Sequence, residues 1–200
     1  WTLMDLPKSS LNQAKKNIVT NNKIKKIILK HDDIIKNIQQ HNFEDYDLVT
    51  GSAFLDIMPF DWFKKFYIKN KNTKLVYFSI NYDGYIKFYP KHNLDRDILQ
   101  LFNNDQKSKK NNKTRAVGPD CSNIINRCFS KTHKCYLFKS NWIDVKNKNF
   151  QLMFLDFCEN IIKTNKKTNF SEWLDFRKEN IIKNNSKLSV SNKDFLAIKI

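Results

Sequence analysis

Apolar and polar residues alternate along the chain in a pattern that predicts strands and helices in turn. Short runs of β-branched and aromatic residues are typical of buried strands, and apolar residues three and four apart are typical of helices. After the candidate capping residues Ser9 and Ser10, for example, Leu11, Ala14 and Ile18 fall on one helical face. The pattern predicts strands at 1–5, 23–30, 46–51, 74–80, 85–89, 134–139 and 188–198, and helices at 10–19, 34–40, 62–68, 94–103, 118–131, 149–164 and 171–184.

Strands that alternate with helices predict an α/β fold with a Rossmann-like, doubly wound and mostly parallel sheet. Residues 81–84 (NYDG) predict a tight turn, after which 85–89 would return as the partner strand of a hairpin. We interpret the Lys- and Asn-rich stretch 105–115 as a loop within a small helical and hairpin insertion, and we expect the C-terminal strand to run antiparallel. The prediction is therefore a single domain that spans residues 1–200.

The chain is strongly basic, with 36 Lys and Arg against 20 Asp and Glu and a formal net charge of +16. Such a charge invites a nucleic-acid interpretation. However, only four of the basic residues are arginines, and phosphate-reading surfaces favour the bidentate arginine fork. A solvated lysine-rich surface is therefore the preferred interpretation, and attraction to RNA or to another anionic ligand is the alternative.

The cysteines do not predict a metal site. Cys121, Cys128 and Cys135 are spaced by seven residues, which matches no zinc-ligand pattern, and we expect the first two along one helix and the third in the next strand. No secretory leader opens the sequence, and no apolar run approaches the roughly 20 residues of a membrane helix. Free thiols in a reducing cytoplasm are therefore expected.

The most informative stretch is 46–58 (YDLVTGSAFLDIM), which predicts a strand that runs into a ligand-facing turn. Gly51, Ser52 and Ala53 bring three small residues together in a chain that has three glycines in all. Small residues at the carboxyl end of a strand let the backbone approach a ligand, and open α/β sheets bind ligands at that end. Carboxylates also follow the two preceding strands, at Asp5 and at Asp32 and Asp33, although acidic residues after strands are also common turn formers.

In this order the motifs resemble those of class I, Rossmann-like methyltransferases that use S-adenosylmethionine. WTLMDLPKSSLNQA resembles the second strand and its helix, YDLVTGSAFLDIMPFDWFKKF the fourth strand and its loop, and KLVYFSINYDGYIKFYP the fifth strand with a hairpin. AVGPDCSNIINRCF, KSNWIDV, SEWLDFRKENI and SVSNKDFLAI resemble the distal part. Each motif is degenerate, so the resemblance depends on their order and spacing over most of the 200 residues.

The resemblance implies roles for particular residues. Asp5 would bind ribose, Asp32 or Asp33 with Ile34 would border adenine, Thr50, Gly51, Ser52 and Ala53 would line the methionine end, Phe54 would wall the pocket, Asp56 would orient a substrate group, and Tyr82 and Trp142 would form a substrate lid. For Phe54 and Trp142 the alternative is ordinary core packing, and for Asp56 it is a favourable charge at a helix N-terminus. No catalytic base is assigned.

The sequence departs from the family at the first strand and its G-x-G-x-G loop, neither of which is present. In the family that strand lies between the strand ending at Asp5 and the strand starting at Asp47. We therefore expect an N-terminally truncated methyltransferase domain that is poorly stable alone and binds its cofactor weakly. The acceptor is expected to be a small molecule, since no N-P-P-Y-like sequence follows the fourth strand. The alternatives are a non-catalytic Rossmann-like binding module and a basic RNA-binding or RNA-modifying protein.

Overall fold

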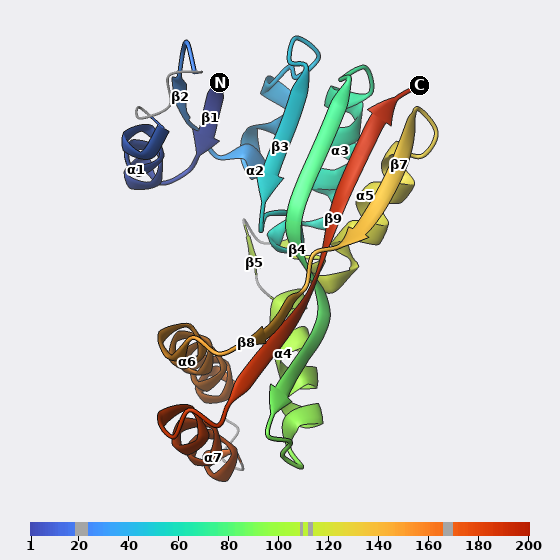
Figure 1. Cartoon of the computed structure of the whole chain (residues 1–200). Coiled ribbons are helices and arrows are strands. Elements are labelled where there is room, and N and C mark those ends of the chain that lie inside the picture. Colours follow the sequence, from blue (N-terminus) through green and yellow to red (C-terminus); the bar gives the residue numbers. More distant parts are fainter. Residues whose placement is uncertain (19–23, 109, 112–113, 166–169) are drawn as a thin grey trace.

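The structure is a computed structural model that describes residues 1–18, 24–108, 110–111, 114–165 and 170–200. Strands and helices alternate over much of this length (Figure 1). The strands are β1 (Thr2–Asp5), β2 (Ile28–His31), β3 (Leu48–Ser52), β4 (Leu75–Tyr89), β5 (Lys110–Asn111), β6 (Thr114–Arg115), β7 (His133–Lys139), β8 (Trp142–Val145) and β9 (Lys187–Lys199). The helices are α1 (Lys8–Ile18), α2 (Ile34–Asn37), α3 (Phe60–Asn70), α4 (Asp95–Ser108), α5 (Cys121–Phe129), α6 (Lys148–Thr164) and α7 (Ser171–Ile182), with short 3-10 turns η1 (Ile38–Gln40), η2 (Leu55–Ile57) and η3 (Gly118–Asp120).

The larger strands form two sheets that lie side by side (Figure 1). β1 and β2 pair in parallel, and the main sheet has the order β3-β4-β9-β7 with β8 also paired to β9. β3 and β4 are parallel, whereas β9 is antiparallel to both β4 and β7. β8 is antiparallel to β9 as well, so four strands of the main sheet run in one direction and the C-terminal strand runs in the opposite direction. This arrangement confirms the predicted α/β class and the antiparallel C-terminal strand.

The predicted hairpin at 81–89 is wrong, because β4 continues through this region as one strand of 15 residues. The predicted turn residues instead form irregularities within the strand. Ile80 and Gly84 have positive φ values of 54° and 87°, and the pairing with β9 shifts register between 78 and 81 and again between 82 and 86. Bulges of this kind bend a strand without reversing it. β9 pairs on both sides of the bend, which keeps the chain extended.

Three other boundaries differ from the prediction. β2 begins at Ile28, and the predicted start at residue 23 lies outside the described residues. β8 was not expected, because four residues with an aspartate among them carry little periodic signal. In the stretch 105–115, α4 extends to Ser108 and the short strands β5 and β6 pair antiparallel, so much of the predicted loop has regular structure.

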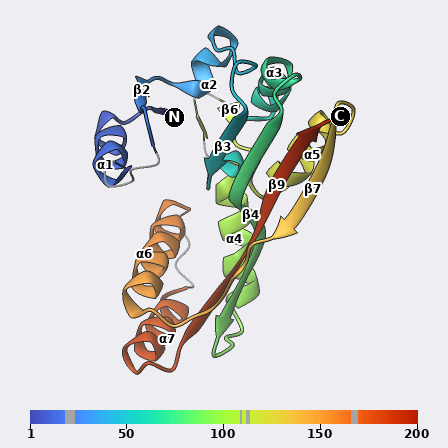
Figure 2. The same cartoon turned by 45° about the horizontal axis from the view of Figure 1, so that its top comes forward.

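One face of the main sheet is covered and the other is open. Helices α3 and α5 lie on one face, where Val76, Phe78 and Phe195 are at most 2% exposed (Figures 1 and 2). In the parts of the chain that the structure describes, no helix packs on the opposite face of β3, β7, the first half of β4 and the second half of β9. There Leu75 and Ile198, which pair across β4 and β9, are 36% and 38% exposed. Parallel α/β sheets ordinarily carry helices on both faces.

A second hydrophobic cluster lies beyond the bend in β4. The second half of β4 and the first half of β9 extend beyond the part of the main sheet that contains β3 and β7, and α4, α6 and α7 pack around them (Figure 2). Phe88, Phe102 and Trp173 lie in this cluster. The ring of Phe88 meets that of Trp173 edge-on at 5.2 Å, and all three side chains are at most 8% exposed. The two long strands β4 and β9 therefore contribute side chains to both hydrophobic clusters.

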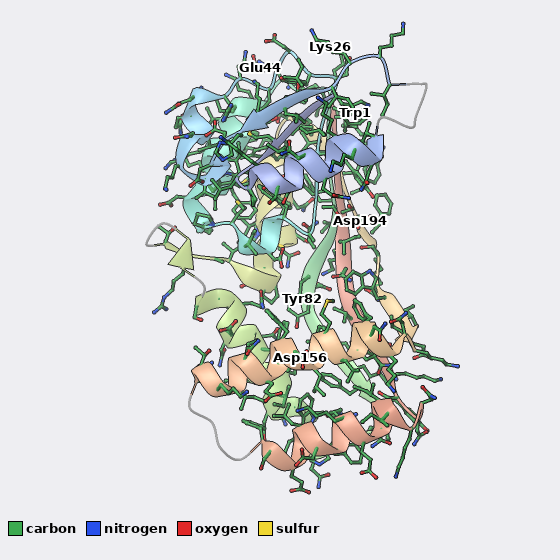
Figure 3. The ribbon with its side chains drawn as sticks, turned by 90° about the vertical axis from the view of Figure 1, so that its left-hand side faces the viewer. Trp1, Lys26, Glu44, Tyr82, Asp156 and Asp194 are labelled. Carbon is green, nitrogen blue, oxygen red and sulfur yellow. The ribbon has the colours of Figure 1, made fainter. Side chains whose placement is uncertain are left out.

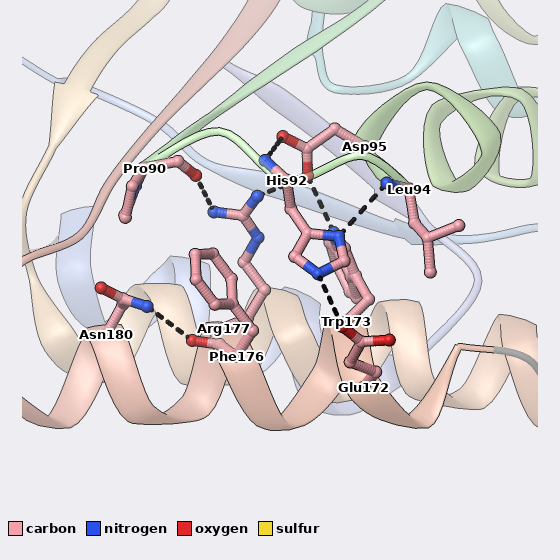
Figure 4. Close-up of polar contacts among 9 residues, drawn as sticks. All are labelled: Pro90, His92, Leu94, Asp95, Glu172, Trp173, Phe176, Arg177 and Asn180. Atoms are coloured by element: carbon pink, nitrogen blue, oxygen red, sulfur yellow. Dashed lines mark hydrogen bonds and ion pairs between the residues drawn. The ribbon is translucent and has the colours of Figure 1, made fainter.

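A buried charge network holds α7 against the start of α4 (Figure 4). Arg177 is 2% exposed, donates from Nη1 to the carbonyl of Pro90 at 2.6 Å, and pairs through Nη2 with Oδ1 of Asp95. The same oxygen accepts from Nε1 of Trp173 at 2.8 Å, and Oδ2 accepts from the backbone N–H of His92 at 2.9 Å. The guanidinium also lies 4.9 Å from the ring centre of Phe88. Ion pairing, hydrogen bonds and ring contacts together offset part of the desolvation of this arginine.

The two sheets are not joined by strand pairing. In Figure 1, β1 and β3 lie next to each other and point the same way, yet among the described residues β1 pairs with β2 alone and β3 with β4 alone. The hydroxyl of Tyr46, just before β3, donates to Oγ1 of Thr2 at 3.3 Å. Two unpaired strand edges therefore face each other. This is the place where the sequence resemblance puts the family's first strand.

Candidate binding site at the carboxyl ends of the strands

The first half of the candidate site is the carboxyl end of the β1–β2 sheet, where Asp5 lies at the end of β1. Its side chain is exposed, and Oδ1 accepts from the backbone N–H of Leu6 at 2.7 Å. Its carbonyl accepts from the N–H of Asp32 at 3.1 Å, so the two predicted acidic positions are neighbours through the backbone. Asp5 is therefore the carboxylate of this group that points to solvent with capacity for further hydrogen bonds.

Asp32 and Asp33 are engaged by their own surroundings. Oδ1 of Asp32 accepts from Nδ2 of Asn37 at 2.6 Å, and Oδ2 lies 2.8 Å from Nε2 of His41. Asp33 caps α2 by accepting from the N–H groups of residues 35 and 36, and it pairs with Lys36 at 3.3 Å. Both aspartates therefore order the segment after β2. Ile34, at the start of α2, uses its carbonyl to accept from Nε1 of Trp62 at 3.1 Å.

The Asp32 network predicts a loss of stability in acid. The hydrogen bond from Asn37 is the main cause that holds the pKa of Asp32 below its ordinary value of 3.8, with His41 adding to it. A carboxyl group whose pKa is lowered by folding stabilises the fold above its unfolded pKa, and this stability is lost as the pH falls through the folded pKa. We expect urea unfolding between about pH 6 and pH 3 to show a smaller acid loss in Asp32→Asn than in the unchanged chain.

Asn37→Ala is the matched variant, because it removes the donor and leaves the carboxylate in place. It is expected to show the same reduction in the acid-linked change. An acid loss that is identical in the unchanged chain and in both variants would contradict this account of Asp32.

The second half of the site is the carboxyl end of β3. The side chains of Thr50 and Ser52 are exposed there, on the open face of the sheet. Gly51 faces the covered side, where an added Cβ would lie 2.8 Å from Cε1 of Phe78, so a larger residue would have to displace the Phe78 ring. Ala53 has a φ of 49° and donates its N–H to the carbonyl of residue 79 at 2.9 Å. The small residues thus fit a tight turn, as the sequence predicts.

The residues after this turn pack inward. Phe54 stacks on Phe78 at 5.9 Å between ring centres and meets Trp62 edge-on at 5.5 Å, which agrees with the core-packing alternative. Asp56 lies in η2, half-buried, and its charge contributes to raising the pKa values of Tyr82 and Cys121. The role proposed for Asp56 stays a prediction.

The two candidates for a substrate lid lie in different settings. Tyr82 is 8% exposed, on the stretch of β4 that joins the upper and lower parts (Figure 3), and its hydroxyl donates to Oδ1 of Asn103 at 2.8 Å. Burial raises the pKa of the Tyr82 hydroxyl well above its ordinary value. Trp142 is 38% exposed on β8 and meets Phe150 edge-on at 5.3 Å. Tyr82 is thus a core residue, and Trp142 is the exposed one of the pair.

The structure therefore brings the predicted residues into two groups on two sheets. Asp5, Asp32 and Asp33 lie at one sheet end, and Thr50–Phe54 at the other, across the unpaired edges of β1 and β3. Over the described residues, two small hollows lie in the second hydrophobic cluster, around α4, α6 and α7, and neither has room for a small molecule. Within the same ranges, no three His, Cys, Asp or Glu side chains gather as a metal site.

Two polar residues near the site were missed by the sequence analysis. Asn81 is fully buried, and Asp194 lies on β9 opposite the bend in β4. Asn81 belongs to the predicted NYDG turn and Asp194 to the predicted strand 188–198, and neither residue carries a site signal of its own in that context. The two residues come together only when β4 pairs with β9, and these strands are more than 100 residues apart in sequence, so no local pattern predicts the contact.

Comparison with known proteins found no matching family model and no matching curated protein. Solved structures of similar fold include phosphoethanolamine N-methyltransferase 2 from Haemonchus contortus in complex with S-adenosyl-L-methionine, at 11% identity and a TM-score of 0.44 over 99% of this chain and 43% of that one. Another is the cyclopropane synthase MmaA2 from Mycobacterium tuberculosis, at 8% identity and a TM-score of 0.47 over 98% of this chain and 69% of that one. The chain spans less than half the length of the first of these proteins.

The helices were also compared with the requirements of a membrane span. Among those that the structure describes, none has both the length and the apolar character to cross a bilayer.

Proposed function

We propose that this chain belongs to an S-adenosylmethionine-dependent methyltransferase that acts on a small-molecule acceptor in the cytoplasm. The observation that carries the proposal is the strand arrangement: the reversed C-terminal strand β9 lies between β4 and β7, and β1 and β3 face each other with unpaired edges. The sequence resemblance predicts the reversed strand, and it puts the absent first strand at those edges. The candidate ligand residues lie at carboxyl strand ends, where α/β sheets bind ligands.

The residues present fit an S-adenosyl group in part. The exposed carboxylate of Asp5 has acceptor capacity for two vicinal hydroxyls, which is the requirement of a ribose. The hydroxyls of Thr50 and Ser52 are exposed beside the tight turn at Ala53. The cofactor would supply a methyl group on a positively charged sulfur. The chain's own part is to hold the nucleoside and to orient the acceptor, which is most of what an in-line displacement requires.

The test is calorimetric titration of the 200-residue chain with S-adenosylhomocysteine. Because the strand ends are open between β1 and β3, we expect saturable but weak binding, with a Kd above about 10 μM. Asp5→Asn is expected to weaken binding by about tenfold, since hydrogen bonds to a charged acceptor are the stronger kind. Asp45→Asn is the matched control, an exposed aspartate before β3 and away from the strand ends.

The outcomes separate the alternatives. Binding without methyl transfer to any amine or hydroxyl acceptor supports a non-catalytic binding module. Binding of single-stranded RNA with a steep salt dependence, and none of S-adenosylhomocysteine, supports the RNA-binding alternative. No S-adenosylhomocysteine binding at millimolar concentration, or binding that Asp5→Asn leaves unchanged, contradicts the proposal.

A further inference from the structure

Two residues of the candidate site region have left-handed backbone conformations that are unusual for their type. Ala53 follows β3 with a φ of 49°, and Ile80 lies within β4 with a φ of 54°. A β-branched residue at positive φ is a genuine outlier, and such residues persist only where their surroundings hold them. The two are linked, because the N–H of Ala53 donates to the carbonyl of Ser79, the residue before Ile80.

Asp194 on β9 holds the bulge that contains Ile80. Between the pairs 78/195 and 81/193, two residues of β4 lie opposite Asp194 alone, which is the signature of a β-bulge. Oδ1 of Asp194 accepts from the N–H of Ile80 at 2.8 Å, and Oδ2 accepts from the hydroxyl of Tyr77 at 2.6 Å. This second bond is the main cause that raises the pKa of the Tyr77 hydroxyl. Figure 3 shows Asp194 on β9, above Tyr82.

Asn81 connects the bulge to the loop after β3. Its side-chain nitrogen donates to the carbonyls of Phe78 at 3.2 Å and Lys193 at 3.0 Å, which spans the two strands. Its Oδ1 accepts from the N–H of Leu55 at 3.3 Å, and both Asn81 and Leu55 are fully buried. The loop 53–55 is thus attached to the bulge at two points, through Ser79 and through Asn81.

We propose that Asp194 is a positioning residue for the loop 53–55, acting through the bulge at Ile80. By fixing Ile80 in the left-handed conformation, Asp194 presents the carbonyl of Ser79 to Ala53 and the side chain of Asn81 to Leu55. The positioning itself is independent of ligand. That the positioned loop receives a cofactor rests on the proposed function.

The primary test is amide hydrogen exchange of the full chain, followed by mass spectrometry of peptides. In Asp194→Ala, we expect the rate of exchange in 51–56 to rise by about tenfold or more relative to that in the edge-strand peptide 133–139. Without the hydrogen bond from Asp194 the bulge is no longer held, so local opening of the loop costs less free energy. Asp194→Asn keeps an oxygen for the Ile80 N–H and is expected to stay close to the unchanged chain. Ile80→Gly in the Asp194→Ala background is expected to restore protection, since glycine adopts positive φ without support.

The matched control is Asp83→Ala, which removes an ion pair with Lys193 at 2.8 Å on the same two strands. It is expected to leave the ratio of exchange in 51–56 to that in 133–139 unchanged. Equal acceleration of both peptides in Asp194→Ala would reduce Asp194 to a global stabiliser and overturn the proposal, as would full protection of 51–56.

Titration with S-adenosylhomocysteine separates this proposal from the proposed function. If both hold, Asp194→Ala weakens binding by about tenfold, and the added Ile80→Gly change recovers it. If no variant and no unchanged chain binds the ligand, the proposed function fails, while the exchange ratios still decide the role of Asp194.

Discussion

Replacing Asp95 by alanine is expected to lower the free energy of unfolding by about 3–5 kcal/mol, because the buried Arg177 would then have no opposite charge beside it. Arg177 is 2% exposed, and the carboxylate of Asp95 also accepts from Trp173 and from the backbone of His92 (Figure 4). One substitution therefore leaves a buried guanidinium and a buried indole N–H without their acceptor. Urea unfolding followed by circular dichroism measures the loss.

Asp97→Ala is the matched control, since Asp97 lies in the same first turn of α4 and is exposed. It removes a carboxylate near the same helix N-terminus, and we expect a loss within about 0.5–1 kcal/mol. A second variant, Asp95→Ala with Arg177→Met, removes both charges and is expected to recover part of the stability. Equal losses for Asp95→Ala and Asp97→Ala would show that the network contributes nothing beyond a helix-end charge.

The parts of the fold that follow local pattern were predictable from sequence. The apolar runs of β3, β7 and β9 and the periodic helices α6 and α7 lie within a few residues of their predicted positions. The bend in β4 was not, because the NYDG sequence at 81–84 is a strong turn signal in isolation. Pairing with β9 over both halves of β4 overrides that signal. Tertiary contacts of this kind have no local trace in the chain.

In the candidate site, too, features with a local sequence pattern were predictable and features set by tertiary contacts were not. The turn at Ala53, directly after β3, was predictable, because small residues at the end of an apolar run have a local physical meaning. The engagement of Asp32 by Asn37 and His41 was not, and neither was the burial of Tyr82 in the lower cluster. A motif gives the type and order of side chains, whereas their availability to a ligand depends on neighbours that the motif does not name.

Val76 and Leu75 are adjacent on β4, and their replacement by glutamate is expected to lower the free energy of unfolding by very different amounts. Val76 is fully buried beneath α3 and α5, so Val76→Glu places an unpaired charge in the core and should cost more than about 3 kcal/mol. Leu75 is 36% exposed on the open face, so Leu75→Glu should cost about 1 kcal/mol or less. Thermal unfolding of both variants under the same conditions makes the comparison.

The contrast tests the open face directly, because the two positions share a strand, a substitution and almost the same place in the sheet. Replacing a residue on an open face by a charged one is expected to change the free energy of unfolding little.

Removing an apolar side chain from the exposed surface is also expected to reduce self-association of the chain. Phe138→Glu, at 49% exposure on β7, should therefore reduce light scattering at high concentration without lowering the unfolding temperature by more than a few degrees. If Leu75→Glu unfolds the chain as Val76→Glu does, both faces of the sheet are covered in solution, and the single-sided arrangement of α3 and α5 is not the whole of the packing.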